Sequence, residues 1–252
     1  MIESRLTRAI ATFDLAADAV AGVLRATTDW GGSGLREGQY AVDLDADAAC
    51  LDVLYGAGFR VLSEESGVTG PSGSESAPIV VVDPLDGSTN ASRGVPWFGT
   101  ALCLVDDDGP AASLVVNHAT GERFTAVRDA GAQRDDEPIA PSGATEMSAA
   151  IIGVSGLPTH HYGWAQFRAL GASAPDLCAV ACGVIDAWCD MYDDGHGVWD
   201  YLASVLIVAE AGGVVAEVND RELCVLDPTE RRAPVAAATP ELLAAVLEQR
   251  RQ

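Results

Sequence analysis

The sequence predicts an α+β fold arranged in layers. Its 252 residues begin and end with helical spacing of apolar side chains, over about residues 3–26 and 240–249. Between residues 98 and 127, three apolar, β-branched segments are separated by Asp-Gly and Thr-Gly turns, which is the spacing of an antiparallel meander. Because strands and helices then alternate in a mixed order, we expect layered α+β architecture and not a doubly wound parallel sheet.

The first half of the chain contains a second helix and a run of strands. The helix covers residues 42–55 and follows a Gly-rich loop at 31–38. Short apolar runs bounded by turn residues then predict strands. The predicted strands are 59–63, 79–82, 98–105, 111–117 and 122–127.

A polar, turn-rich stretch at residues 129–148 separates two predicted lobes. We place the boundary near 136–145, so that residues 1–140 form an N-terminal α+β lobe and residues 141–252 a C-terminal α/β lobe, together one domain. Beyond the boundary, the predicted strands are 149–154 and 214–218, and the predicted helices are 163–170, 177–188, 199–211 and 240–249.

Charge and composition exclude several classes of partner. The formal net charge is −22, with 15 arginines and no lysine. Since nucleic-acid backbones and anionic membranes are bound by clustered basic side chains, we expect neither as a partner. An anionic substrate would need local cations, and bound metal is the obvious source.

The compartment follows from the chain's start and its cysteines. The first residues are expected to form an amphipathic helix and not a signal peptide. The most apolar later stretch, 201–218, is broken by Glu210 and two glycines, so we expect a buried helix there and not a membrane span. None of the six cysteines forms a CxxC pair. We therefore expect a cytoplasmic protein with reduced, buried thiols and no zinc site.

The most informative segment is residues 79–90. An apolar strand ends at Asp83, Pro84 and Gly87 make a turn, and a second carboxylate follows at Asp86. Two acids held that close repel each other unless a cation lies between them, and hard oxygen ligands at a tight turn favour magnesium. The alternative is a turn capped by its own polar side chains.

The residues after this turn favour an anion beside the metal. Gly87 lets a phosphate approach the backbone, and Ser88 begins a run of helix-capping residues. A helix that starts there would offer free N–H groups to an oxyanion. The Ser88 hydroxyl is also placed to hold a water molecule.

Further acids at element ends are candidates for the same site. Glu64 follows the strand at 59–63, Asp200 opens the helix at 199–211, and Asp43 lies near the start of the helix at 42–55. Taken singly, each has a structural alternative as surface charge, helix cap or solvated side chain. Their joint meaning depends on whether they converge, and spacing leaves that open.

Two long motifs are similar to those of the inositol monophosphatase family, within the lithium-sensitive, magnesium-dependent phosphatase superfamily. They are Val-Val-Asp-Pro-Leu-Asp-Gly-Ser-Thr-Asn (81–90) and Val-Trp-Asp-Tyr-Leu-Ala-Ser-Val-Leu-Ile-Val-Ala-Glu-Ala-Gly-Gly (198–213). Shorter matches occur in family order at 63–66, 121–126 and 167–174, and the resemblance spans about residues 5–245. It implies a layered αβαβα sandwich of the inositol monophosphatase/fructose-1,6-bisphosphatase type.

The resemblance implies two or three magnesium ions and assigns their ligands. Glu64, Asp83 and the Leu85 carbonyl would hold the first ion. Asp83, Asp86 and Asp200 would hold a second, and Asp43 lies near a third, weaker position. The N-terminal lobe would thus carry most of the metal site, and the C-terminal lobe Asp200 and the substrate pocket.

The resemblance also implies the substrate contacts. Glu64 and Ser88 would orient the attacking water, with Asp83 completing the catalytic set. The phosphate would contact residues 85–88, and the hydroxyl side of the substrate would be lined from the C-terminal lobe. The implied substrate residues are Leu85, Asp86, Gly87, Ser88, Gly171, Ala172, Ser173 and Asp190, with Arg168 nearby.

This sequence departs from the family pattern in three places. Ala91 replaces the usual aromatic residue, the loop lysine is missing with Arg36 as its candidate substitute, and the segment before Asp200 (191–199) is a few residues longer. Within it, contact of His196 with substrate stays open, but we expect a loop histidine without a role. The other three histidines indicate turns and surface only.

The expected activity is magnesium-dependent, lithium-sensitive hydrolysis of inositol monophosphate or a similar small polyol or sugar phosphate, by a homodimer. One alternative is a sister phosphatase for fructose 1,6-bisphosphate, histidinol phosphate or a nucleotide 3′- or 2′-phosphate. A second alternative is a transcription-associated interaction protein of the same family, in which catalysis is dispensable.

Overall fold

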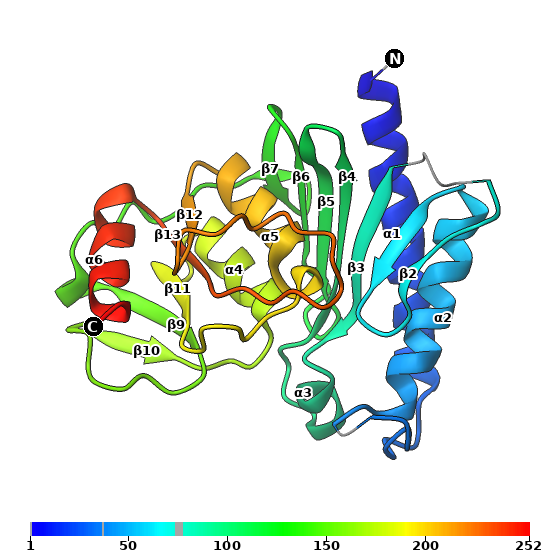
Figure 1. The fold of residues 1–252 in the computed structure, drawn as a ribbon, viewed down its shortest axis with the longest axis horizontal. Helices are drawn as coiled ribbons and strands as arrows, with labels where there is room; N and C mark the ends of the chain where they lie inside the picture. Colours follow the sequence, from blue (N-terminus) through cyan, green and yellow to red (C-terminus); the bar gives the residue numbers. More distant parts are fainter. Residues whose placement is uncertain (1, 37, 74–77) are drawn as a thin grey trace.

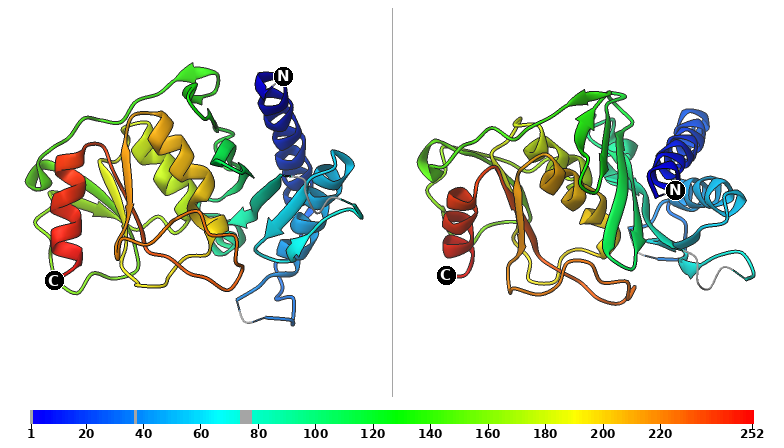
Figure 2. Two further views of the ribbon diagram at one scale, coloured as in Figure 1. Left: turned by 45° about the horizontal axis from the view of Figure 1, so that its top comes forward. Right: turned by 90° about the horizontal axis from the view of Figure 1, so that it is seen from above.

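The protein is a five-layer αβαβα sandwich. The computed structural model describes residues 2–36, 38–73 and 78–252. Helices α1 (Ile2–Ala26) and α2 (Ala41–Gly56) cover the outer face of a large sheet, and α4 (Ser173–Ala181) and α5 (Val198–Glu210) lie between it and a smaller sheet. Helix α6 (Pro240–Arg250) covers the far side of the smaller sheet, at the opposite end from α1 (Figures 1 and 2). The layered architecture implied by the resemblance is confirmed.

The large sheet has eight strands in the order β2-β1-β3-β4-β5-β6-β7-β8. All neighbours are antiparallel except β1 and β3, which run parallel with Ser63 opposite Val82. Their carboxyl ends therefore meet at the same edge of the sheet. The strands are β1 (Arg60–Ser63), β2 (Gly67–Thr69), β3 (Ile79–Asp86), β4 (Gly99–Asp106), β5 (Gly109–Asn117), β6 (Arg123–Val127), β7 (Gly131–Arg134) and β8 (Glu137–Pro138).

The smaller sheet has the order β10-β9-β11-β13-β12, with β10 at one edge. It begins after a short 3₁₀ turn at Met147–Ala149, beyond the last strand of the large sheet. The predicted lobe boundary at 136–145 overlaps β8, the last strand of the large sheet, and extends into the segment between the sheets. The division into lobes stays a prediction. The strands are β9 (Ile151–Ser155), β10 (Gln166–Arg168), β11 (Ala187–Asp190), β12 (Val214–Glu217) and β13 (Pro234–Ala237).

Strand β3 is buried along its whole length because helices cover both faces of the large sheet. Val80 and Val82 point towards α1 and α2, where they join a core with Phe13. Val81, between them, points the other way and joins the core around α4 and α5, together with Trp188. Alternate residues of one strand thus bind the outer and the central helix layers together.

Two predicted helices are wrong. Residues 163–170 contain the edge strand β10 instead, which pairs in parallel with β9. The apolar segment 177–188 divides: α4 ends at Ala181, close to Gly183 at φ +73°, and β11 then lies between β9 and β13. An apolar run buried on all sides carries no helix or strand period, so only its partners decide the difference.

The cysteines and helices bear on the expected compartment. All six cysteines are free, and Cys50, Cys103, Cys178 and Cys189 are buried. Within the described residues, no helix combines the length and the hydropathy needed to cross a bilayer.

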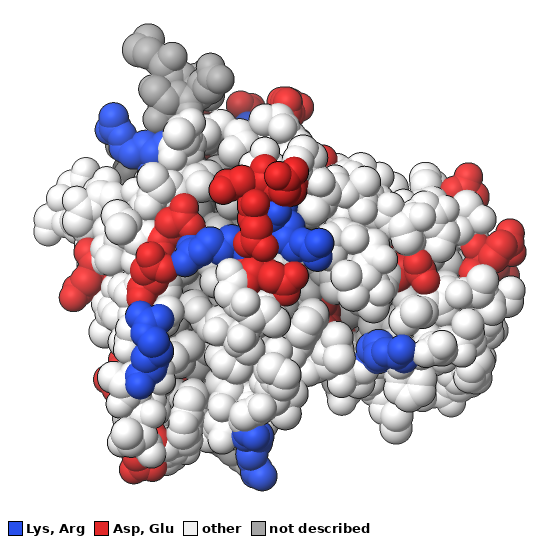
Figure 3. Space-filling view, turned by 180° about the vertical axis from the view of Figure 1, so that it is seen from behind, with Lys and Arg blue, Asp and Glu red and all other residues white. Residues whose placement is uncertain are grey.

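On the face shown in Figure 3 the arginines are scattered, and the central ones lie among acidic side chains.

Leu102 on β4 tests the outer core. It is fully buried, whereas Leu15 on α1 is 62% exposed. We expect Leu102→Ala to lower the free energy of unfolding by about 2–5 kcal/mol, since it removes buried methyl groups and leaves a cavity. Leu15→Ala should change it by less than about 0.5 kcal/mol. Equal effects in urea unfolding would contradict this account of the core.

Candidate active site

Three acids from distant parts of the chain meet at the edge of the large sheet. Glu64 directly follows β1, Asp83 lies in β3, and Asp200 lies in the first turn of α5. One carboxylate oxygen of each lies within 4.8 Å of the others. The parallel pairing of β1 with β3 brings the first two together, and α5, which packs on β3, adds the third.

Asp86 joins this group through an irregularity in β3. The register with β4 shifts between Asp83 and Asp86, which turns the end of the strand. The Leu85 N–H donates to Asp83 Oδ1 at 3.0 Å, and the Thr100 hydroxyl donates to the Pro84 carbonyl at 2.7 Å. Asp86 Oδ2 accepts from the Ala174 N–H at 2.6 Å, so the turn is tied to the start of α4.

Gly87 permits this close packing. Its φ is +83°, and a Cβ there would lie 2.8 Å from the Ala172 Cβ. Helix α3 (Ser88–Arg93) begins directly after it, as predicted. The Asn90 side-chain amide donates to the carbonyls of Trp97 and Leu170, both at 2.7 Å. Asn90 therefore ties the helix after the turn to the segments before β4 and after β10.

The carboxylates destabilise one another when no cation is present. Burial, and then the neighbouring acids, raise the pKa of Glu64 to about 8, and burial with the Asp200 charge raises that of Asp86 to about 8. Burial also raises the pKa of Asp83 well above its ordinary value and raises that of Asp200. The four converging carboxylates are hard oxygen donors that lack enough positive charge around them. They therefore fit a divalent cation such as magnesium.

Asp43 faces one side of this group. Its Oδ2 accepts from the Tyr40 N–H at 2.8 Å, while its Oδ1 is buried with no hydrogen-bond partner among the described residues. Burial raises its pKa to about 6. Asp43, Glu64 and Ser88 line one cavity of about 220 Å³. The buried, unpaired oxygen fits a further cation or an ordered water there.

Arg36 closes the same cavity. Its guanidinium lies 2.9 Å from Glu65 and 3.4 Å from Glu64. Arg36, the candidate substitute for the missing loop lysine, thus reaches the acidic group.

A second cavity, of about 280 Å³, lies on the other side of Asp86 and Asp200. The predicted substrate residues 171–173 line it, and the Ser173 hydroxyl donates to the Asp200 carbonyl at 3.0 Å. His196 and Trp188 complete the wall. The two cavities therefore border the acids from opposite sides.

Two predicted substrate residues lie elsewhere. Asp190 is fully buried and bonded to His196 Nδ1 at 2.7 Å. Arg168 is exposed on β10, where it donates to the Phe167 carbonyl and to Gln166, and it lines a separate hollow beside Trp164. Neither Asp190 nor Arg168 lines the cavity that residues 171–173 border.

Sequence reasoning left one residue of the second cavity open and missed another. Contact of His196 with substrate was left open, although no role was expected, and His196 lines the cavity. Asp176, on α4, accepts from the indole N–H groups of Trp97 at 2.7 Å and Trp188 at 2.9 Å. The longer 191–199 segment was the only signal for the first, and the second had none. His118 lies in the turn after β5 and is half-buried, with its Nε2 2.7 Å from the Thr100 hydroxyl.

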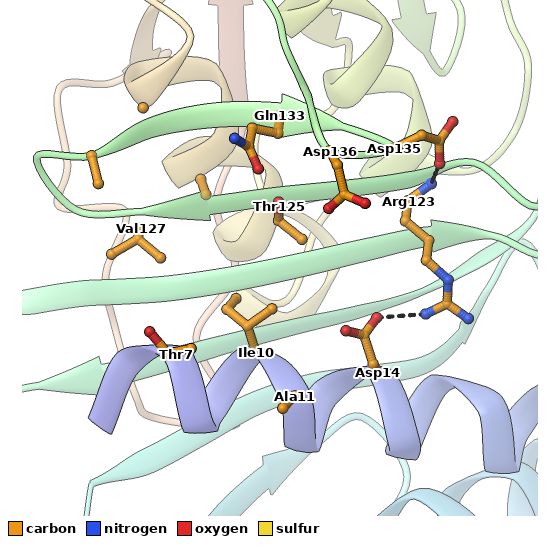
Figure 4. A pocket seen from close by; sticks show the side chains of 13 residues that line it. Thr7, Ile10, Ala11, Asp14, Arg123, Thr125, Val127, Gln133, Asp135 and Asp136 are labelled. Atoms are coloured by element: carbon orange, nitrogen blue, oxygen red, sulfur yellow. Dashed lines mark hydrogen bonds and ion pairs between the residues drawn. The ribbon is translucent and has the colours of Figure 1, made fainter. Parts of the chain in front are cut away.

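A larger hollow, of about 620 Å³, is unrelated to these acids. It lies between α1 and strands β6 and β7 (Figure 4). Arg123 crosses it and pairs with Asp14 at 2.7 Å and with Asp18 at 2.5 Å. Two of the acids at this hollow are thus paired with an arginine, unlike Asp83 and Asp200 of the acidic group.

Comparison with known proteins identifies the family. The family model described as the inositol monophosphatase family matches residues 39–252. The chain belongs to the inositol monophosphatase family. This membership supports phosphatase activity and metal dependence.

Individual relatives carry more than one name. A fructose-1,6-bisphosphatase/inositol-1-monophosphatase of Methanothermobacter thermautotrophicus is 33% identical over 222 residues, covering 80% of this chain and 79% of the relative. The Nus factor SuhB of Pasteurella multocida is 29% identical over 195 residues, covering 71% of each.

Solved structures agree with the fold. The extragenic suppressor protein SuhB from Bartonella henselae superposes with a TM-score of 0.82 at 25% identity, covering 96% of this chain and 98% of that chain. Mycobacterium tuberculosis SuhB superposes with a TM-score of 0.75 at 26% identity, covering 98% and 96%.

The crowded carboxylates predict pH-dependent stabilisation by magnesium. The folded-state pKa values of Glu64 and Asp86, about 8, exceed their ordinary values of 4.5 and 3.8, so the metal-free fold takes up protons and loses stability as the pH rises towards 8. Binding at 100 times the Kd would add about 3 kcal/mol. We expect the Tm measured with Mg²⁺ to exceed the Tm measured with EDTA by more at pH 8 than at pH 5.5, because protons compete with Mg²⁺ for the carboxylates at the lower pH. An equal difference in Tm at the two pH values would contradict this expectation.

Proposed function

We propose that this protein is a magnesium-dependent phosphomonoesterase that hydrolyses inositol monophosphate or a similar small polyol or sugar phosphate. The observation that carries the proposal is the convergence of Glu64, Asp83 and Asp200 within 4.8 Å, in a chain of this family. Asp86 and Asp43 border the same group on its two sides. Such a group of buried acids is unfavourable without cations and is suited to a metal-assisted reaction on an anion.

The residues that would hold the ions follow from this placement. Glu64, Asp83 and the Leu85 carbonyl would hold one ion, and Asp83, Asp86 and Asp200 a second. Asp43, with its unpaired oxygen, would serve a third. Divalent ions in such a site supply positive charge that activates water and neutralises phosphate oxygens.

The chain's own residues position water and phosphate. Glu64 and Ser88 face one cavity with Asp43, so a water there can donate to the carboxylates while the Ser88 hydroxyl fixes its orientation. The phosphate would lie along residues 85–88, next to the acids that would hold the cations. Arg36, beside Glu64, adds a positive charge at the mouth of that cavity.

The alcohol part of the substrate would occupy the second cavity. Residues 171–173 form one wall of it, and the Ser173 hydroxyl is anchored to the Asp200 carbonyl, so the wall is fixed relative to the acids. The cavity of about 280 Å³ suits a small polyol or sugar better than a nucleotide.

Two alternatives have support from relatives. The Methanothermobacter thermautotrophicus protein is named for both fructose-1,6-bisphosphatase and inositol-1-monophosphatase, which keeps a sugar bisphosphate among the candidates. The Nus factor name of the Pasteurella multocida relative keeps a transcription-associated role as a second candidate. The complete set of converging acids favours the enzyme. The free cysteines accord with the reducing cytoplasm, where we place it.

The acids provide the direct test. We expect Asp83→Asn and Asp200→Asn each to lower kcat/KM by at least about 10³-fold, because each removes a charge that holds the cations. Phosphate release would be measured on inositol 1-phosphate, fructose 1,6-bisphosphate, histidinol phosphate and a nucleotide 3′-phosphate, with Mg²⁺, with EDTA, and with added lithium, which should inhibit. Asp52→Asn, at an exposed position of α2, is the matched control. Full activity of either site variant would remove that acid from the mechanism.

We propose a homodimer that uses the β10 edge. Phe167 on this edge strand is 53% exposed, and Leu157, in the segment that leads to it, is 84% exposed. Exposed apolar side chains beside an unpaired edge strand are suited to burial against a second copy.

Phe167→Glu should shift the protein from dimer to monomer in size-exclusion chromatography with light scattering, because it buries a charge in the proposed interface. Val68→Glu is the control. Val68 is 47% exposed and lies on β2, an edge strand of the large sheet, so this variant should stay dimeric. A monomeric wild type, or a Phe167→Glu variant that stays dimeric, would refute this interface.

A further inference from the structure

The long 191–199 segment brings a histidine to the substrate side of the acids. His196 lines the cavity that Asp86 and Asp200 border, and its side chain is 12% exposed. Such a side chain is accessible from the cavity but largely fixed by its surroundings.

The orientation of the imidazole follows from its partner. Nδ1 lies 2.7 Å from Asp190 Oδ2, and since a carboxylate only accepts, Nδ1 carries a proton. Within the described part of the chain, Nε2 has no hydrogen-bond partner. The ring therefore has one nitrogen committed to the protein and one left for a ligand.

The ring is also fixed by its neighbours. It meets the Trp188 ring edge-on, at 5.5 Å between centroids and 69° between planes. Trp188 is fixed in turn by its N–H···O bond to Asp176, which also accepts from Trp97. The wall that supports His196 is thus joined to helix α4 and to the segment after α3.

The backbone of the segment is anchored as firmly. His196 N–H donates to the Arg232 carbonyl at 3.1 Å, and the Arg232 N–H donates back at 2.9 Å. Two further arginines hold the acidic residues before it, Arg221 on Asp194 at 2.7 Å and Arg250 on Asp193 at 2.8 Å. The imidazole is therefore preorganised before substrate binds.

Asp190 itself is covered. Its side chain has no exposed area, and Gly195 passes so close that a Cβ there would lie 2.4 Å from Asp190 Oδ2. A substrate hydroxyl in the cavity reaches the imidazole but not this carboxylate.

We propose that His196, through Nε2, hydrogen-bonds to a hydroxyl of the substrate's alcohol part, and that Asp190 acts behind it as a positioning residue. The inference rests on the proposed phosphatase function and narrows its substrate class. The enzyme then selects phosphate esters that carry a free hydroxyl within reach of the cavity wall, over aryl phosphates that lack one.

The test compares two kinds of ester. kcat and KM would be measured on the best polyol or sugar phosphate of the panel and on 4-nitrophenyl phosphate, and the ratio of the two kcat/KM values gives the selectivity. We expect His196→Ala to lower this ratio about tenfold, the worth of one hydrogen bond, mainly through KM of the polyol ester. Asp190→Asn should lower it in the same direction, and His196→Gln should restore part of it.

His161→Ala is the matched control, since His161 is exposed and lines a different hollow. An unchanged ratio in His196→Ala, an equal loss on both esters, or an equal fall of the ratio in His161→Ala would overturn the inference. So would a wild type that hydrolyses 4-nitrophenyl phosphate but no polyol ester. If the wild type hydrolyses neither kind of ester, the proposed phosphatase function itself is wrong. This outcome distinguishes a failure of the proposed function from a failure of the inference about His196.

Discussion

The structure depends on the burial of like charges at one point. Glu64, Asp83, Asp86 and Asp200 come together where strands of the large sheet end and helix α5 begins. Burial raises the pKa of each, and repulsion from neighbouring acids of the group adds to this at Glu64, Asp83 and Asp86. A fold tolerates such a group only when the backbone around it is fixed elsewhere. The hydrogen bonds from Thr100 to Pro84 and from Ala174 to Asp86 provide that support from two directions.

The same support arranges the rest of the site. Tying Asp86 to α4 places residues 171–173 beside the acids. Asp176, in the first turn of α4, accepts from Trp188 of the cavity wall and from Trp97. The metal-binding turn and the proposed substrate cavity are therefore one connected structure. The 191–199 segment, held by three arginines, then determines which polar atom faces the substrate.

Sequence reasoning succeeded where residue type and local conformation are tightly coupled. The turn at 83–87 needs a proline, a glycine at positive φ and two acids in a short span. Such a turn can therefore be predicted from the sequence alone. The helices at both ends show an apolar period because one face of each is solvated. It failed for residues 163–170 and for 182–188 of the helix predicted at 177–188, where burial or a short edge strand erases the period and pairing with β9 decides the outcome.

By itself, the sequence predicted layered α+β architecture, the acids at element ends and the turn that carries two of them, because these depend on local chemistry. The αβαβα order of the layers was implied by the resemblance of its motifs to a known family. Tertiary structure alone decided that β1 runs parallel to β3, so that Glu64 and Asp83 become neighbours. It also decided that Asp190 is covered by His196. Both outcomes depend on chain segments far apart in sequence packing against one another, and spacing along the chain does not encode the direction in which a side chain points.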